Sequence, residues 1–343
     1  MWIAVLTWIA RSLREGSLKL PHRRQFLHLT AGAAALPTAS RIAWAQAYPS
    51  RPIRLVVGLT PGAASDITAR LFGTGAAPVL GQQIVVENRP GAAGSIAAQA
   101  VSRAANDGYT LFLLALSTLT NEIIDPAPSF DLSKAFAPIA PLANGTVVLV
   151  VNPMTSIHSV SELIALAKSK PNEVLYGSTG PGSIPQLAAE LFAQRTGIKL
   201  THVPYPGSPQ IAGDLMGGRI TMSFNIASAM IGQIMAGQLT ALATAANKRA
   251  SALPDVPTMA EAGFPDFDAS LWLGLVAPAG TPRPAIDKLA YAAHKAMQSP
   301  ETIETLRKQG YEPLDAGPDE FAAFIRSEIT RWSDVARAAG LKS

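Results

Sequence analysis

The chain has 343 residues, of which 48% are hydrophobic and 15% are charged, and it contains no Cys. This length suits about two domains, and the missing thiols exclude disulfide scaffolds, Cys-ligated zinc or iron–sulfur sites and Cys nucleophiles. Residues 1–47 hold six of the 28 Lys and Arg residues but only one of the 24 Asp and Glu residues. Residues 48–343 therefore carry a net charge of −1, so the overall charge of +4 gives no reason to expect a nucleic-acid partner.

Residues 1–47 have the features of an export signal. Arg23 and Arg24 precede an apolar pair, a weakly hydrophobic run of small residues follows, and Ala45-Gln46-Ala47 matches an A-x-A cleavage site. A basic turn before an ordinary helix is the alternative, but the ordered succession of three regions favours export. The run is also too short to span a bilayer. We therefore expect a twin-arginine signal cut after Ala47 and a mature protein in the periplasm.

Apolar runs of strand length alternate with helical periodicity after residue 52, which is typical of an α/β architecture. In the first half we expect strands at 53–58, 84–87 and 110–115 and helices at 65–79 and 95–104. In the second half we expect a strand at 147–151, a helix at 159–169 and short strands near Val174, His202, Ile220 and Leu242. A strand at 271–277 then leads into three C-terminal helices, the first with apolar residues at helical spacing.

Known catalytic and cofactor motifs do not match this sequence. The Gly-rich loop at 177–183 lacks the Lys of a Walker loop, and Pro185 stands where a dinucleotide-binding fingerprint needs Gly. After residue 47 the His residues are His158, His202 and His294, far apart in the sequence, and a lone His is usually structural. We therefore expect no catalytic residue, no metal site and no cofactor.

Two loops of similar composition each lead from a strand into a helix, one in each half of the chain. The loops at 60–66 and 178–183 present small residues, hydroxyls and backbone N–H groups at the positive end of a helix dipole. Such groups can hold a carboxylate without a basic side chain. The alternative is that Ser65 or Asp66 caps the first helix and Ser183 caps the second. Both uses can coexist, because a cap leaves other N–H groups for a ligand.

Six ordered motifs carry a resemblance to a known family. They are Glu87–Gly94 (ENRPGAAG), Asp107–Leu111 (DGYTL), His202–Tyr205 with Gly207, Asp214–Gly218 (DLMGG), Val256–Gly263 (VPTMAEAG), and Trp272 with Ala277–Pro282 (APAGTP). Over residues 48–343 the chain resembles the Bug family, the extracytoplasmic solute receptors of tripartite tricarboxylate transporters. Both loops depart from the family's pattern. In the first, Ala63 and Ala64 replace glycines and Gly58-Leu59-Thr60 replaces a Pro-containing segment, and in the second Gln186 replaces a His. These departures leave the identity of the ligand open.

The resemblance implies a two-lobed periplasmic binding protein of the "Venus flytrap" type, with a small organic carboxylate in a cleft between the lobes. It implies lobe 1 at 48–146 plus 274–343 and lobe 2 at 147–273. We expect the ligand to contact both loops and neighbouring strand ends, at Thr60, Ala63, Ala64, Ser65, Asp66, Ser117, Thr118, Ser178, Thr179, Gly180, Gly182, Ser183, Tyr205 and Asn225.

As a receptor, the protein would act as a monomer that closes on its ligand and is then recognised by the permease subunits of such a transporter. A ligand sensor for a signalling partner would use the same closure and stays an alternative. An enzyme acting on a carboxylate is a further alternative. It would need a titratable group in both loops, and only Asp66 qualifies.

Overall fold

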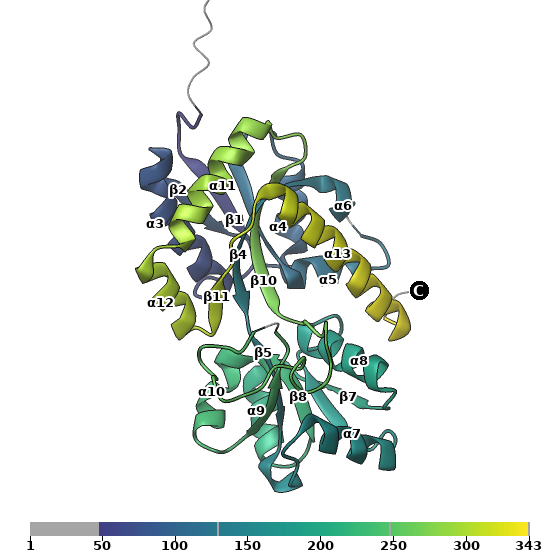
Figure 1. The fold of residues 1–343 in the computed structure, drawn as a ribbon. Helices are drawn as coiled ribbons and strands as arrows, with labels where there is room; N and C mark the ends of the chain where they lie inside the picture. Colours follow the sequence, from purple (N-terminus) through teal and green to yellow (C-terminus); the bar gives the residue numbers. More distant parts are fainter. Residues whose placement is uncertain (1–47, 129, 247, 342–343) are drawn as a thin grey trace, which may run out of the picture. The chain divides into compact units, whose positions relative to one another are not determined.

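The structure is a computed structural model that describes residues 48–128, 130–246 and 248–341. The expected export signal, residues 1–47, lies outside the described residues. Figure 1 shows that the described chain forms two α/β lobes, each built around one sheet. The α/β, two-lobed fold expected from the sequence is therefore confirmed.

Within the described residues the first sheet has six strands. They are β1 (Ile53–Val57), β2 (Ile84–Asn88), β3 (Thr110–Ala115), β4 (Phe136–Gly145), β10 (Leu271–Pro278) and β11 (Tyr311–Pro313). Their order is β11-β4-β10-β3-β1-β2, with β1, β2 and β3 parallel and β10 antiparallel to both of its neighbours. The carboxyl ends of β1, β2 and β3 therefore lie at one edge, where α/β proteins usually bind ligands.

Helices cover both faces of this sheet. They are α3 (Ala64–Leu80), α4 (Ser95–Ser102), α5 (Leu116–Ile124), α6 (Leu132–Ala135), α11 (Arg283–Met297), α12 (Pro300–Lys308) and α13 (Pro318–Ala338), with a 3-10 turn, η1 (Ala92–Gly94), before α4. The side chains of β1 alternate between the faces. Leu55 packs in the core with α3 and α11, whereas Val56 packs in the core with α4, α5 and α13.

The second sheet has five strands among the described residues. They are β5 (Val147–Val151), β6 (Leu175–Ser178), β7 (Thr201–Pro204), β8 (Met222–Ile226) and β9 (Thr240–Thr244), in the order β7-β6-β8-β5-β9. Its helices are α7 (Val160–Ser169), α8 (Ile184–Thr196), α9 (Ser208–Met216) and α10 (Ala227–Met235), with a 3-10 turn, η2 (Pro153–Thr155), after β5. Strand β6 is parallel to β7 and β8, so their carboxyl ends also share one edge.

The chain passes between the two sheets twice, once from β4 to β5 and once from β9 to β10. We call these two connections the crossings. Strand β10 belongs wholly to the first sheet, so residues 271–273 lie in that sheet although the sequence assigned them to lobe 2. The rest of the expected lobe division stays a prediction. Among the residues that the structure describes, no helix is both long enough and apolar enough to cross a membrane.

Strand β4 was not among the expected strands. It contains Pro138 and Pro141, and proline is uncommon in a strand inside a sheet. The structure accommodates both prolines through irregular pairing with β10. The register shifts between Leu273 and Gly274 and again between Leu275 and Val276, and each shift lies next to a pairing with one of the prolines. The missing proline N–H groups therefore fall at breaks in the ladder, where their loss costs little.

Candidate functional site

Three loops of the first lobe meet at the carboxyl ends of β1, β2 and β3. A Cβ added to Gly58 would lie 2.5 Å from the Cα of Gly94, and one added to Gly94 would lie 2.5 Å from the Thr118 hydroxyl. That hydroxyl donates to the carbonyl of Ala93 at 2.8 Å. The expected site residue Thr118 is thus buried and fixes the η1 turn. It is not left free for a ligand.

Asp66 shapes the first loop from inside helix α3. Its Oδ2 accepts hydrogen bonds from the Gly62 N–H at 2.9 Å and from Arg70 Nε at 3.1 Å, and Arg70 also lies 3.0 Å from Oδ1. The N-cap is Ala63, which makes no side-chain cap bond. The alternative that Ser65 or Asp66 caps α3 is therefore wrong. The first N–H groups of a helix have no intrahelical partner, so those of Ala64, Ser65 and Asp66 can receive an anion.

The electrostatics of Asp66 follow from these contacts. Burial favours the neutral acid, but hydrogen bonds from Arg70, the Gly62 N–H and Asn88, together with the charge of Arg70, outweigh it and lower the pKa below its ordinary value. Asp66 is therefore a carboxylate at neutral pH. Because its oxygens bind Gly62 and Arg70, it organises the loop and is poorly placed as a proton donor.

The second loop satisfies more of its own N–H groups than we expected. Gly180 N–H donates to Ser178 Oγ at 3.1 Å, and Gly182 N–H donates to Gln186 Oε1 at 2.7 Å. Ser183 occupies the N-cap position of α8 but makes no cap bond, because its hydroxyl donates to the Gly180 carbonyl at 2.7 Å. Pro185 has no N–H group. The N–H groups at the start of α8 that can bind an anion are therefore those of Ile184 and Gln186.

The fold brings Ser178 and His202, which are distant in the sequence, into contact. Ser178 Oγ lies 2.6 Å from His202 Nε2, and Gln186 Nε2 lies 3.5 Å from His202 Nδ1. The sequence analysis did not foresee this pair, because the two residues are 24 positions apart. The Ser178 side chain is nevertheless fully buried and also bonds the Gly180 N–H. A substrate cannot reach it in this arrangement, so the pair supports the loop.

Polar groups without partners occur at three of the expected positions. Ser65 Oγ, Ser117 Oγ and Asn225 Nδ2 are buried and have no hydrogen-bond partner among the described residues. Ser65 and Ser117 lie at the starts of α3 and α5, and Asn225 lies at the end of β8. Buried polar groups nearly always have partners, so these atoms mark where a polar ligand would complete the hydrogen bonding.

The other expected positions divide by exposure. Thr60 and Thr179 are exposed, and Ala63, Ala64 and Gly180 are half-buried at the loops. Tyr205 is committed elsewhere, because its hydroxyl donates to Asp214 at 2.7 Å. Sequence reasoning missed His202 as a support of the second loop. It also missed Glu122 of α5, a buried carboxylate without a hydrogen-bond partner among the described residues.

The two lobes approach each other at Gly182. A Cβ added to Gly182 would lie 2.1 Å from Ile124 Cδ1, at the end of α5. The second loop therefore touches the first lobe directly. Across the described ranges no group of three or more His, Asp or Glu residues could hold a metal ion. The arrangement thus offers hydrogen-bond donors from both lobes, which is chemistry suited to binding an anion.

Comparison with known proteins decides the family. Residues 68–341 match the family described as "Tripartite tricarboxylate transporter family receptor". The chain belongs to this receptor family. Protein BugT of Bordetella pertussis is 38% identical over 315 residues, which cover 91% of this chain and 95% of BugT. The Bug resemblance is confirmed, and members of the family are periplasmic solute-binding receptors.

Two solved structures are similar to this receptor in fold as well as in sequence. A Rhodopseudomonas palustris protein with adipate is 33% identical, with a TM-score of 0.71, over 85% of this chain and 98% of that chain. MatC from the same organism, with bound malate, is 30% identical, with a TM-score of 0.68, over 84% of this chain and 99% of MatC. The match over nearly all of each relative supports one shared two-lobed architecture.

Proposed function

We propose that this receptor captures a small organic carboxylate between its lobes and delivers it to the permease of a tripartite tricarboxylate-type transporter. The observation that carries the proposal is the set of unpartnered polar groups at Ser65, Ser117 and Asn225, together with the free N–H groups at the start of α3. Relatives that are 30% and 33% identical hold malate and adipate, respectively, which are both small dicarboxylates.

The donors favour an acid that carries its own negative charge. Neither loop contains Lys or Arg, so recognition rests on N–H groups, hydroxyls and an amide. Hydrogen bonds from such neutral donors to a carboxylate are stronger than those to a neutral carbonyl. Esters and amides of the correct acid should therefore bind much more weakly than the acid itself.

Two further parts of the proposal concern location and partners. The receptor is exported by the twin-arginine route, cut after Ala47, and acts in the periplasm as a monomer. Its closed form, in which the ligand bridges the lobes, is the form that the permease subunits recognise. Differential affinity for that form is what drives closure.

A thermal-shift screen of the exported chain, followed by calorimetry, tests the proposal. A ligand that binds only the folded state raises the melting temperature by mass action. We expect at least one small dicarboxylate of the adipate or malate type to do so, and its dimethyl ester to fail. An ester that binds as tightly as its acid, or no response to any organic acid, would contradict an anion site.

A matched pair of variants locates the binding. Asn225→Ala removes the amide nitrogen that has no partner, together with the oxygen that accepts from Ser208 Oγ and the Ile226 N–H. We expect it to weaken binding of the acid by about 1 to 2 kcal/mol. Asn172→Ala is the control, because Asn172 is an exposed turn residue outside both loops. Equal affinity of the two variants for the acid would place the ligand elsewhere.

A further inference from the structure

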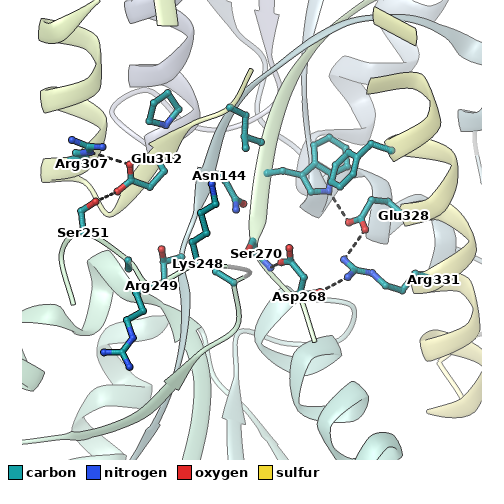
Figure 2. A pocket seen from close by; sticks show the side chains of 17 residues that line it. Asn144, Lys248, Arg249, Ser251, Asp268, Ser270, Arg307, Glu312, Glu328 and Arg331 are labelled. Atoms are coloured by element: carbon teal, nitrogen blue, oxygen red, sulfur yellow. Dashed lines mark hydrogen bonds and ion pairs between the residues drawn. The ribbon is translucent and has the colours of Figure 1, made fainter. Parts of the chain in front are cut away.

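A cavity of about 570 Å³ lies beside the crossings, and none of the expected ligand-binding residues lines it. Figure 2 shows its walls: the end of β4, the start of β10, strand β11, helix α13 and the segment that joins β9 to β10. Small-molecule sites in proteins typically measure about 300 to 1,000 Å³. The cavity is therefore large enough for a small organic ligand.

The charges that line this crossing cavity leave one cation without a counter-charge. Three basic residues are ion-paired, in the pairs Arg249–Glu261 (3.0 Å), Arg307–Glu312 (3.0 Å) and Arg331–Glu328 (2.7 Å). The fourth, Lys248, has no ion pair or hydrogen bond within the described part of the chain. In Figure 2 its side chain runs between the Arg307–Glu312 group and the Glu328–Arg331 group. Asp268 also lines the cavity, but its carboxylate accepts the Ser270 N–H at 2.9 Å.

One wall of the crossing cavity is aromatic. Trp272 and Phe324 make an edge-to-face contact with ring centroids 5.5 Å apart and an interplanar angle of 73°. The Trp272 ring is fixed, because its Nε1 donates to the buried carboxylate of Glu328 at 2.9 Å. Phe324 is 36% exposed and is among the few exposed large apolar side chains of the described residues. A rigid aromatic surface of this kind favours a flat apolar group.

We propose that the crossing cavity is a second ligand site, which takes a small aromatic carboxylate. Its acid group pairs with the Lys248 ammonium, and its ring packs against Phe324 and Trp272. The site is separate from the proposed carboxylate site at the strand ends, because the two share no residue. Its occupant would contact helix α13 of the first lobe and the segment at 248–251, so it would restrain one of the two crossings about which the lobes move.

Calorimetric titration of the exported chain with benzoate, and with benzamide as the uncharged analogue, tests this proposal. We expect benzoate to bind to the wild type. Lys248→Gln should lower the affinity for benzoate about tenfold or more, which corresponds to about 1.4 kcal/mol. Phe324→Ala should weaken benzoate severalfold, and benzamide should bind the wild type more weakly than benzoate does. Both replaced side chains are at least partly exposed, so both variants should fold.

Matched controls come from the same chain. Lys168 is an exposed lysine of α7 and Tyr291 is a 57% exposed aromatic residue of α11, and neither lines the cavity. Lys168→Gln and Tyr291→Ala should bind benzoate like the wild type. The proposal is overturned if benzoate does not bind, if Lys248→Gln binds it unchanged, or if Asn225→Ala abolishes binding while Lys248→Gln does not. The last result would place benzoate in the strand-end site.

Discussion

His202 controls the second loop through its two ring nitrogens. Gln186 Oε1 accepts from the Gly182 N–H, so the Gln186 amide nitrogen faces His202 Nδ1, and the neutral ring accepts there. The ring then donates from Nε2 to Ser178 Oγ. Burial lowers the pKa of His202 below its ordinary value of 6.5, and the nearby charge of Glu190 opposes this only partly. The loop is therefore built around a neutral histidine.

Protonation of His202 should loosen this loop. A proton at Nδ1 would face the Gln186 amide donor and break the chain of bonds to the Gly182 N–H. Because the folded pKa is lowered, the unfolded chain binds this proton more readily. Stability therefore falls as the pH drops below about 6.5, until the folded pKa is reached. We expect the melting temperature of the wild type to fall more than that of His202→Gln between about pH 7.5 and pH 5.5.

The control for this pH effect is His158→Gln, since His158 is exposed and outside both loops. It should keep the wild-type dependence of melting temperature on pH. Parallel curves for the wild type and His202→Gln would show that His202 is not the responsible group.

Replacing Asp66 distinguishes the receptor hypothesis from the enzyme hypothesis. Asp66→Asn keeps an acceptor for the Gly62 N–H but loses the ion pair with Arg70, whose side chain is 54% exposed. The Asp66 side chain is only 5% exposed, but the solvent around Arg70 screens the pair and limits its contribution to about 1 kcal/mol. We expect the variant to fold, to lose about 1 kcal/mol of stability or less, and to retain affinity for the acid within about tenfold. Chemical denaturation and calorimetry measure the two quantities.

Mass spectrometry of the bound acid completes the Asp66 experiment. The wild type should return the acid unchanged after prolonged incubation. Conversion by the wild type that disappears in Asp66→Asn would show acid–base catalysis and overturn the receptor assignment.

At the scale of elements, the loop between β6 and α8 contains a matched pair of glycines. Gly180 and Gly182 both have positive φ, +107° and +73°, so Ala strains the backbone at either position. Only at Gly182 would the new Cβ also meet another residue, Ile124 of the first lobe. We expect Gly182→Ala to reduce calorimetric affinity for the acid by about tenfold more than Gly180→Ala does.

A double variant checks the cause. Ile124→Ala in the Gly182→Ala background removes the atom that the new Cβ would meet, so part of the lost affinity should return. Equal losses in Gly180→Ala and Gly182→Ala, with no rescue by Ile124→Ala, would mean that this contact between the lobes does not limit binding.

Element by element, the sequence predicted what depends on local pattern. The buried run of β1 and the small-residue loops before α3 and α8 were located correctly, because apolar periodicity and loop composition are local properties. Which N–H groups of the second loop are already hydrogen-bonded was not predictable from the sequence. It depends on a contact between Gln186 of α8 and His202 of β7. Strand β4 was missed for a different reason, since its two prolines are tolerated only through irregular pairing with the distant β10.

For the whole molecule, the first test concerns export, which rests on residues outside the described part of the chain. Changing Arg23 and Arg24 to Lys should leave the full-length precursor in the cytoplasm, because the twin-arginine route requires that pair. The wild-type periplasmic protein should begin at Tyr48 by intact-mass measurement. Unimpaired export of the double variant, or a different N-terminus, would contradict the assignment of residues 1–47.

A crystal structure of the exported chain with the organic acid that stabilises it most tests whether the acid binds between the lobes. We expect a carboxylate within hydrogen-bond distance of the N–H groups of Ala64, Ser65 and Asp66, with Asn225 of the other lobe also in contact with the acid. We also expect Asp66 still to bind Gly62 and Arg70. An acid found only in the crossing cavity, or one covalently changed beside Ser178 and His202, would contradict the proposed function.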